Sequence, residues 1–173
     1  MRGDDEREYV EFVTVRRPGW HRAAYLMCGD PHRADDIVQT TMTALYRKWR
    51  RAKDADNIDA YVHRMLVRAY LAEKRLGWAR VRLLADPPER AAMPPPGGVE
   101  ERDALRAALA RLPQAQRTVL VLRFACDMSV EDVAAAVRTS PGNVKSHTSR
   151  GLAALRDFLD VQPTTPGRKN ALG

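Results

Sequence analysis

A run of small polar and basic side chains follows Ser140-Pro141 near the end of the chain. A helix that starts there would turn outward the side chains of Asn143, Lys145, Ser146, His147, Ser149 and Arg150. Amides, hydroxyls and cations of this kind form hydrogen bonds with base edges and phosphates in the major groove of DNA, and the helix N-terminus itself favours a phosphate. No acidic residue lies between Val133 and Leu155 to oppose a polyanion. The segment therefore predicts a contact with nucleic acid, although a helical hairpin without a ligand would show a similar pattern.

The net positive charge lies in a different part of the chain. The 173 residues include 29 Lys and Arg against 22 Asp and Glu, a formal net charge of +7. Between Arg47 and Arg82 there are 11 basic and 4 acidic residues, so this stretch alone carries the whole excess of +7. Such a concentration predicts a surface for a polyanion. A solvated basic face without a partner is the alternative.

Catalytic, metal-binding and membrane-spanning patterns are absent from the sequence. There is no glycine-rich phosphate loop and no nucleophile beside a base, and the adjacent carboxylates Asp35 and Asp36 fit a helix N-terminus better than catalysis. Cys28 and Cys126 stand alone and the four histidines are scattered, which argues against a zinc site or a disulfide framework. The acidic N-terminus is unlike a signal peptide, and no apolar run could span a bilayer. We therefore expect a cytoplasmic, non-enzymatic protein without a cofactor or metal.

Helical periodicity dominates both halves of the chain, and no stretch alternates as a strand would. We expect an all-α fold of two small helical domains, residues 5–82 and 101–160. The segment 86–99, DPPERAAMPPPGGV, is rich in helix-breaking residues and predicts a flexible linker over about 83–100. Residues 161–173 are expected to form a disordered tail. The expected helices span 5–28, 30–51, 59–77, 101–111, 114–125, 129–137 and 141–158.

Apolar residues at steps of three and four predict which face of each helix is buried. In the N-terminal half these residues are Phe12, Trp20 and Leu26, then Val38, Thr41 or Met42, Leu45 and Trp49, then Tyr61, Met65, Ala69, Ala72 and Leu76. In the C-terminal half they are Val130, Val133, Ala134 and Val137, then Val144, Thr148, Leu152, Leu155 and Leu159. The last two helices, joined by a short turn with Ser140 as the second N-cap, have the layout of a helix-turn-helix.

Two motifs in this order resemble those of a known family. The phrase LPQAQRTVLVLRFACDMSVEDVAAAVRTSPGNVKSHTSRGLAALR (112–156) resembles region 4 of the extracytoplasmic-function sigma factors, which belong to the sigma-70 family of RNA polymerase sigma factors. GDPHRADDIVQTTMTALYRKW (29–49) is similar to region 2.1–2.2 of the same family. The resemblance covers about residues 8–158, and YVHRMLVRAYLAEKR further resembles the actinobacterial SigE-like subgroup.

The resemblance implies a subunit that binds core RNA polymerase and recognises promoter DNA. By this resemblance the helix within 29–49 would dock on the clamp helices of the beta-prime subunit, and the first helices of region 4 would contact the beta flap. An anti-sigma factor is a possible further partner. The docking residues carried over are Asp35, Asp36, Gln39, Thr40, Thr43 and Arg47.

The resemblance also assigns the two DNA contacts. A basic, aromatic-containing groove would hold the opened −10 element as a single strand, and the helix after Ser140 would read the −35 element. The −10 residues carried over are Arg50, Arg51, Lys53, Tyr61, Arg64, Arg68, Tyr70, Lys74 and Arg75. The −35 residues are Ser140, Asn143, Lys145, Ser146, His147, Ser149 and Arg150.

Three positions depart from the family pattern. Arg68 stands where many relatives have an asparagine that helps to capture the extruded base. His147 replaces the usual arginine after Lys-Ser, and Ser149 replaces a bulkier residue before Arg150. We expect altered −10 and −35 preferences. A helix-turn-helix regulator that acts without polymerase would explain 112–156, but it would leave 29–77 without a role.

Overall fold

The computed structural model describes residues 3–83 and 100–160, with 74–83 as backbone only. Every regular element in these ranges is a helix, which confirms the all-α fold class. The N-terminal part comprises α1 (Gly3–Cys28), α2 (Pro31–Arg47), α3 (Trp49–Lys53) and α4 (Ile58–Leu83). The C-terminal part comprises α5 (Glu100–Arg111), α6 (Gln114–Leu120), the π-helical turn η1 (Val121–Ala125), α7 (Val130–Val137) and α8 (Pro141–Asp160). The expected linker segment 86–99 and the tail 161–173 lie outside the described residues.

The helix boundaries follow local signals in the sequence. Asp30 caps α2 with its side chain, and Pro31 occupies the first turn of that helix. The single helix expected over 30–51 is divided at Lys48, whose φ of −114° is not helical, into α2 and the short α3. No helix in the described part of the chain is long and apolar enough to cross a membrane.

The N-terminal core lies between α1, α2 and α4. Trp20, Val38, Leu45 and Trp49 are buried in it as expected. Phe12 packs against Trp20 and Trp49 with ring centroids 5.9 and 5.3 Å apart. The Phe12–Trp49 contact joins α1 to the start of α3, and the Phe12–Trp20 contact lies within α1.

The predicted buried face of α4 is wrong by about one residue. The expected Tyr61, Met65 and Ala69 are only half-buried and Ala72 is exposed, while the side chain of Leu76 is outside the described residues. The residues buried instead are Val62, Leu66, Val67 and Tyr70. The reason is that α4 is covered on two sides. Val62, Leu66 and Tyr70 pack into the N-terminal core, and Val67 packs into the C-terminal part.

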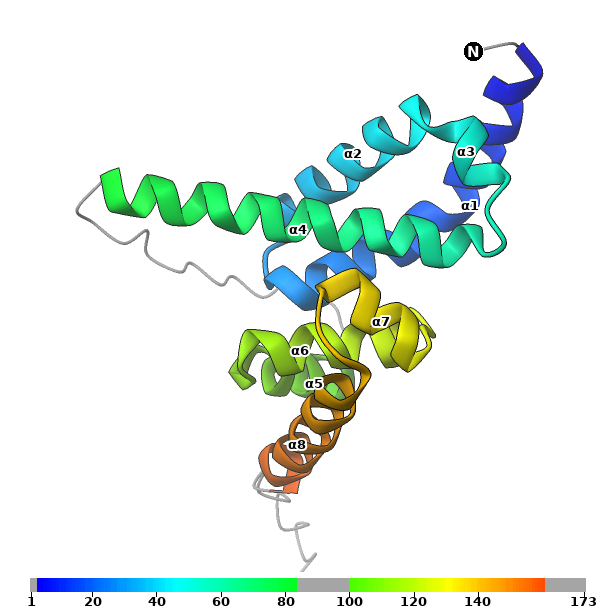
Figure 1. Ribbon diagram of the computed structural model, residues 1–173. Coiled ribbons are helices and arrows are strands. Elements are labelled where there is room, and N and C mark those ends of the chain that lie inside the picture. The colour runs from blue at the N-terminus through cyan, green and yellow to red at the C-terminus, as the bar shows by residue number, and fades with distance from the viewer. Residues whose placement is uncertain (1–2, 84–99, 161–173) are drawn as a thin grey trace, which may run out of the picture.

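The C-terminal part packs directly on the N-terminal part. Figure 1 shows α4 crossing the molecule, with most of α2 above it, α5 to α8 below it, and α1 passing behind it. Within the C-terminal part, α6 and α7 pack against α8, whose Val144 is fully buried and whose Leu155 is also buried. Leu159, expected in the core, is 39% exposed because α8 extends beyond its supports. The arrangement places α4 and α8 on the same compact body.

Candidate nucleic-acid interface

The turn between α7 and α8 has the helix-turn-helix geometry that the sequence predicts. The Ser129 hydroxyl caps α7 by accepting a hydrogen bond from the Asp132 backbone N–H at 3.0 Å. The helix ends at Arg138, which takes the left-handed conformation with φ 57° and ψ 54°. The Ser140 hydroxyl then accepts a hydrogen bond from the Asn143 N–H at 3.1 Å and caps α8. Each of the two helices therefore begins with a side-chain oxygen that accepts from a free backbone N–H of its first turn.

The outer face of α8 is polar and open to solvent. Its exposed residues are Ser140, Asn143, Lys145, Ser146, Ser149 and Arg150, all of them predicted −35 contacts. The exception is His147, which is half-buried, with its Nδ1 atom buried and lacking a hydrogen-bond partner in the described part of the chain. The Asn143 side-chain amide donates to the Thr139 hydroxyl at 3.0 Å, which orients it at the start of the helix. The structure thus brings six of the seven residues together on one accessible face.

Gly151 is a residue of this helix that the sequence analysis did not single out. A Cβ atom at Gly151 would lie 2.8 Å from Leu120 Cδ1 and 3.2 Å from Leu120 Cγ. The glycine therefore lets α8 approach α6 more closely than any side chain would permit. A glycine facing the apolar stripe of an otherwise regular helix was the available signal.

The predicted docking residues form a second polar surface, on α2. Asp35, Asp36, Gln39, Thr40, Thr43 and Arg47 are all exposed. Ala34, Ile37, Val38, Thr41 and Leu45 occupy the opposite, buried side of the helix. Asp35 lies 3.3 Å from the Nε2 atom of His21 on α1. The surface has the accessibility that a protein partner requires, and its backbone is held by the N-terminal core.

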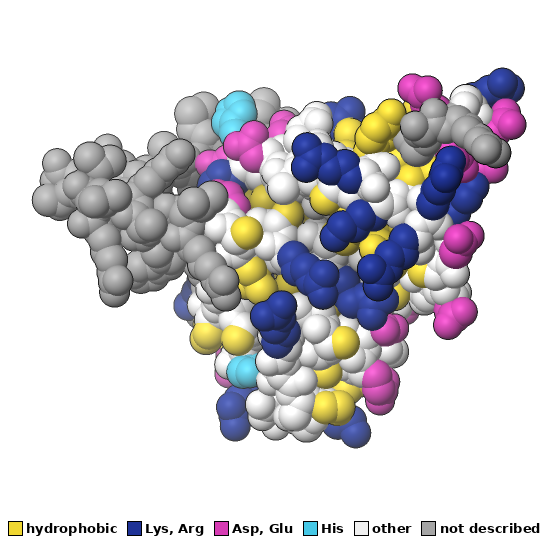
Figure 2. All heavy atoms as spheres, turned by 45° about the horizontal axis from the view of Figure 1, so that its top comes forward, with side chains coloured by type: hydrophobic (Ala, Val, Ile, Leu, Met, Phe, Trp, Pro, Cys, Tyr) yellow, Lys and Arg dark blue, Asp and Glu magenta, His cyan; other side chains and the backbone are white. Residues whose placement is uncertain are grey.

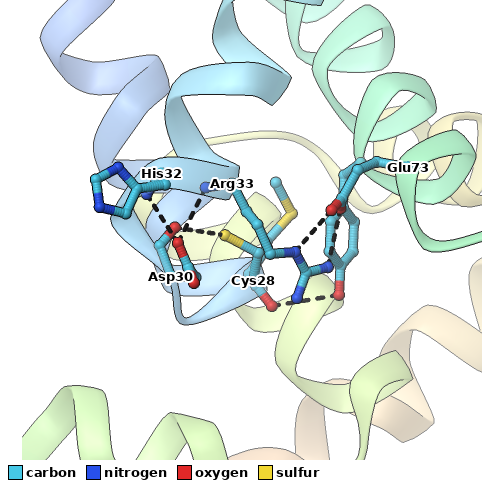
Figure 3. Close-up of polar contacts among 7 residues, drawn as sticks. Cys28, Asp30, His32, Arg33 and Glu73 are labelled. Atoms are coloured by element: carbon cyan, nitrogen blue, oxygen red, sulfur yellow. Dashed lines mark hydrogen bonds and ion pairs between the residues drawn. The ribbon is translucent and has the colours of Figure 1, made fainter. Parts of the chain in front are cut away.

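An ion pair with two hydrogen bonds joins α2 to α4 (Figure 3). Arg33 at the start of α2 donates two hydrogen bonds to the Glu73 carboxylate on α4, at 2.7 and 2.9 Å. The carboxylate raises the pKa of the Arg33 guanidinium. Beside it, the Tyr70 hydroxyl donates to the backbone carbonyl of Met27 at 3.2 Å, and the Cys28 thiol donates to the carbonyl of Asp30. The Arg33–Glu73 ion pair thus joins α2 to α4, and the Tyr70–Met27 bond joins α4 to the end of α1.

Tyr70 is a correction to the predicted −10 contacts. Its side chain is 1% exposed, and its hydroxyl is bonded within the core. The ring is therefore unable to stack on a base without unfolding this part of α4. Of the other α4 residues, Arg68 is exposed, and Tyr61 and Arg64 are half-buried. Lys74 and Arg75 lie on α4, but their side chains are outside the described residues.

Two of the predicted −10 cations are paired with acids of α1. Asp5 accepts hydrogen bonds from Arg50 Nε at 3.0 Å and Lys53 Nζ at 2.7 Å, and Lys53 also reaches Glu8 at 3.0 Å. The two cations lower the pKa of the Asp5 carboxyl, mainly through the hydrogen bond from Lys53. A nucleic-acid phosphate would have to compete with Asp5 for both cations. The short helix α3 is positioned against the N-terminus of α1 by these bonds.

A hollow of about 600 Å³ lies at the α2–α3 junction. It is lined by Tyr46, Arg47, Lys48, Trp49, Arg50 and Arg51. Tyr46 and Lys48 were not among the predicted site residues, although a tyrosine inside a basic run is a recognisable signal for a stacking surface. Tyr46 is 44% exposed, and its ring meets that of Tyr9 edge-on with the centroids 5.2 Å apart. The surface view shows basic side chains gathered across the middle of one face of the molecule (Figure 2).

Comparison with known protein families matches two profiles to this chain. The profile of sigma-70 region 2 matches residues 12–79, and the profile of sigma-70 region 4 matches residues 102–155. The RNA polymerase sigma-E factor of Streptomyces coelicolor is 36% identical over 157 residues, which cover 88% of this chain and 86% of that protein. The RNA polymerase sigma-E factor of Streptomyces avermitilis is 34% identical over 160 residues, with 88% and 86% covered.

A more distant sequence relative and a solved structure are also similar to this chain. The ECF RNA polymerase sigma factor SigE of Mycolicibacterium smegmatis is 29% identical over 86% of this chain and 60% of that protein. The solved structure of the sigma factor RpoE from Bartonella quintana, in complex with the anti-sigma factor NepR, superposes with a TM-score of 0.78 at 23% identity, covering 91% of this chain and 99% of that one. The family profiles, the Streptomyces relatives and the two exposed polar helices lead to one conclusion: this chain belongs to the sigma-70 family of RNA polymerase sigma factors, in its extracytoplasmic-function branch.

Proposed function

We propose that this chain is an alternative sigma factor that binds core RNA polymerase and directs it to particular promoters. The observation that carries the proposal is the presence, in one chain and in the family order, of an exposed polar helix at α2 and a helix-turn-helix with an open polar face at α8. A regulator that acts alone needs the second surface but has no use for the first. Residues 5–82 would serve as the region 2 domain and residues 101–160 as the region 4 domain.

The exposed face of α2 is the proposed contact with the beta-prime clamp helices. Asp35, Asp36 and Arg47 provide charges of both signs there, and Gln39, Thr40 and Thr43 provide hydrogen-bonding groups between them. Mixed charges at the rim of an interface give specificity and a fast association rate more than raw affinity. Region 4 would make the second polymerase contact, at the beta flap.

The basic residues of α3 and α4 are the proposed grip on the opened −10 strand. Arg51 and Arg68 are exposed cations, and Arg64 lies one turn before Arg68 on α4. Single-stranded DNA is bound by a basic track beside aromatic side chains on which bases can stack. Tyr46 and Tyr61 have accessible surface and could serve this purpose, whereas Tyr70 is buried.

The outer face of α8 is the proposed −35 reader. Lys145 and Arg150 carry the positive charges, and Asn143 offers an amide at the N-terminal end of the helix, where groove-reading helices make base contacts. The relative from Bartonella quintana was solved with an anti-sigma factor. A partner of that kind is a further proposal for this chain.

The test is transcription from genomic DNA with purified core polymerase, with and without the full-length protein, followed by sequencing of the RNA 5′ ends. We expect new start sites that share upstream −10 and −35 sequences and that appear only when the protein is added. A matched variant, Asp36→Lys with Thr40→Ala, should lose these starts while keeping its helical content. If the protein produced no starts but bound a DNA site tightly by itself, it would be a polymerase-independent regulator and the proposal would be overturned.

A further inference from the structure

A pocket of about 350 Å³ lies beside the turn of the helix-turn-helix. Volumes of this size are typical of small-molecule sites in proteins. Residues from α6 to the first turns of α8 supply most of its described lining, and Leu71 of α4 completes it. Of the predicted DNA and polymerase contacts, only His147 is among the described lining residues. The surfaces assigned above to polymerase and DNA therefore leave this pocket without a role.

Two polar side chains that line the pocket have hydrogen-bonding capacity that the protein leaves unused. Thr118 is only 4% exposed, and its hydroxyl has no hydrogen-bond partner in the part of the chain that the structure describes. The Nδ1 atom of His147 is likewise buried without a described partner. A third lining residue, Thr139, accepts a hydrogen bond from the Asn143 amide at 3.0 Å and can still donate its own proton. Buried polar groups are nearly always satisfied in native proteins, so this lining points to an occupant with hydrogen-bonding atoms.

The charge at the pocket favours an anion. Arg138 is exposed, lines the pocket, and forms no ion pair within residues 3–83 and 100–160. None of the described lining residues is acidic, and the sequence has no acid between Val133 and Leu155. A guanidinium binds a carboxylate through two parallel hydrogen bonds. One cation without a counter-charge therefore suits a ligand with a single negative charge.

The remaining lining is largely apolar. Leu71, Val119 and Val137 present hydrocarbon surface from α4, α6 and α7. An apolar group gains free energy when it leaves water for a surface of this kind. A few polar groups beside an apolar wall are the usual composition of a small-molecule site, because the wall supplies affinity and the polar groups fix the orientation of the ligand.

We propose that this pocket binds a small organic monocarboxylate with an apolar body. The carboxylate pairs with Arg138 and accepts hydrogen bonds from the neighbouring hydroxyls, and the hydrocarbon lies against Leu71 and Val119. Arg138 and His147 belong to the turn and the helix that we assign to the −35 element, so an occupied pocket lowers the affinity for −35 DNA. This consequence rests on the proposed function, whereas the binding site itself does not.

The test is an NMR titration of the full-length, isotopically labelled protein. The probe is 3-phenylpropionate, which combines one carboxylate with an apolar ring and chain. We expect saturable shifts of the amide signals of Thr118, Arg138 and His147, with a dissociation constant of about 0.1–1 mM, as typical ligand efficiencies give for a molecule of this size. The alcohol 3-phenylpropan-1-ol lacks the charge and propionate lacks the ring. Each should bind at least about tenfold more weakly than 3-phenylpropionate.

Two variants at exposed positions locate the binding. Arg138→Gln removes the cation, and Ala115→Phe adds a ring to the pocket lining. The matched controls Arg156→Gln and Ala107→Phe make the same changes at exposed positions outside the described lining. Arg138→Gln and Ala115→Phe should each weaken binding of 3-phenylpropionate at least about tenfold, while the controls keep the wild-type dissociation constant. If Ala115→Phe loses helical content, the smaller Ala115→Leu replaces it, with a weaker effect in the same direction.

An absence of saturable shifts in wild type up to about 10 mM, ten times the weakest expected constant, would overturn the proposal. Binding that both Arg138→Gln and Ala115→Phe leave unchanged would also overturn it, because the ligand would then lie elsewhere.

The effect on DNA is measured with a −35 duplex taken from the start sites found above. Saturating 3-phenylpropionate should lower the affinity of wild type about fivefold relative to the same concentration of propionate, as the loss of one phosphate contact does at about 0.15 M salt. An unchanged affinity would refute the effect on −35 reading. If wild type gives no new start sites, the proposed function fails, while the NMR titration still decides whether the pocket binds a carboxylate.

Discussion

The close approach of α8 to α6 at Gly151 predicts an unusual response to a conservative substitution. Replacing a glycine in a helix interior with alanine normally stabilises the helix by about 1 kcal/mol. At Gly151 the added methyl would lie 2.8 Å from Leu120 Cδ1 and 3.5 Å from Gln116 Cβ. Leu120 is only 3% exposed, so it has little room to move away. Overpacking of this kind costs about 1–3 kcal/mol, and we expect the packing cost to win.

The net change expected for Gly151→Ala is a loss of about 1 kcal/mol in the free energy of unfolding, the difference between the packing cost and the propensity gain. For a chain of this size that corresponds to a decrease of about 2–4 °C in the melting temperature. Gly19 on α1 is the matched control, since a Cβ there meets nothing within 4 Å. Gly19→Ala should gain stability by the propensity term alone. Calorimetry of both variants measures the difference, and a Gly151→Ala protein as stable as Gly19→Ala would refute the close packing of α8 on α6.

Three further predictions concern DNA binding and thiol chemistry. Lys145→Ala should weaken binding to a −35 duplex and lower the slope of log K against log salt concentration by about 1, as the loss of one phosphate contact does. The control is Arg156→Ala, at an exposed site further along α8, which should leave the affinity and the slope nearly unchanged. An unaltered affinity and sequence preference in Lys145→Ala would count against α8 as the helix that reads the −35 element. Asp5→Asn should remove the acid that Arg50 and Lys53 share, leaving Lys53 paired with Glu8 alone, and should tighten binding of a single-stranded −10 oligonucleotide. Because hydrogen bonds lower the pKa of the Asp5 carboxyl, its contribution to stability is present above the ordinary carboxyl range and should be lost as the pH falls through that lowered pKa. Cys126 is half-buried, and desolvation raises the pKa of its thiol to about 12. Alkylation by iodoacetamide at pH 8, followed by mass spectrometry, should therefore be slow in the folded protein and fast after denaturation. Fast labelling without denaturant would show that the thiol is not shielded in the folded protein.

The local signals in the sequence were sufficient for much of this structure. Caps at Asp30, Ser129 and Ser140 fixed where helices begin, and the periodicity of the α2 segment identified Val38, Leu45 and Trp49 as core. These features depend on neighbours within one or two turns, which is the range that a pattern of residues can report.

The failures share one physical cause, which is packing between distant segments. The predicted buried face of α4 is wrong because this helix is covered on two sides and has a broad apolar surface. Periodicity alone does not say which residues of such a helix face which neighbour. The resemblance assigns Tyr70 to DNA, but a tyrosine in a basic helix suits a core hydroxyl as well as a stacking platform. Only the tertiary structure shows that its hydroxyl is bonded to Met27. The burial of Val67 by the C-terminal part has no signature within α4 itself.

At Arg138 a positively charged residue occupies a backbone conformation that glycine adopts at lower energy. Its left-handed conformation, φ 57°, costs a non-glycine residue about 1 kcal/mol or more, and glycine would adopt it freely. The chain nevertheless has an arginine at the turn of the helix-turn-helix, where Arg138 lines a pocket together with Leu71 of α4 and His147 of α8. Arg138→Gly is thus a route to a more thermostable protein that leaves the fold alone and removes one positive charge beside the reading helix. Arg138→Gly would therefore be a first substitution for raising the melting temperature. Any loss of promoter discrimination in this variant would measure the contribution of the Arg138 side chain to DNA recognition.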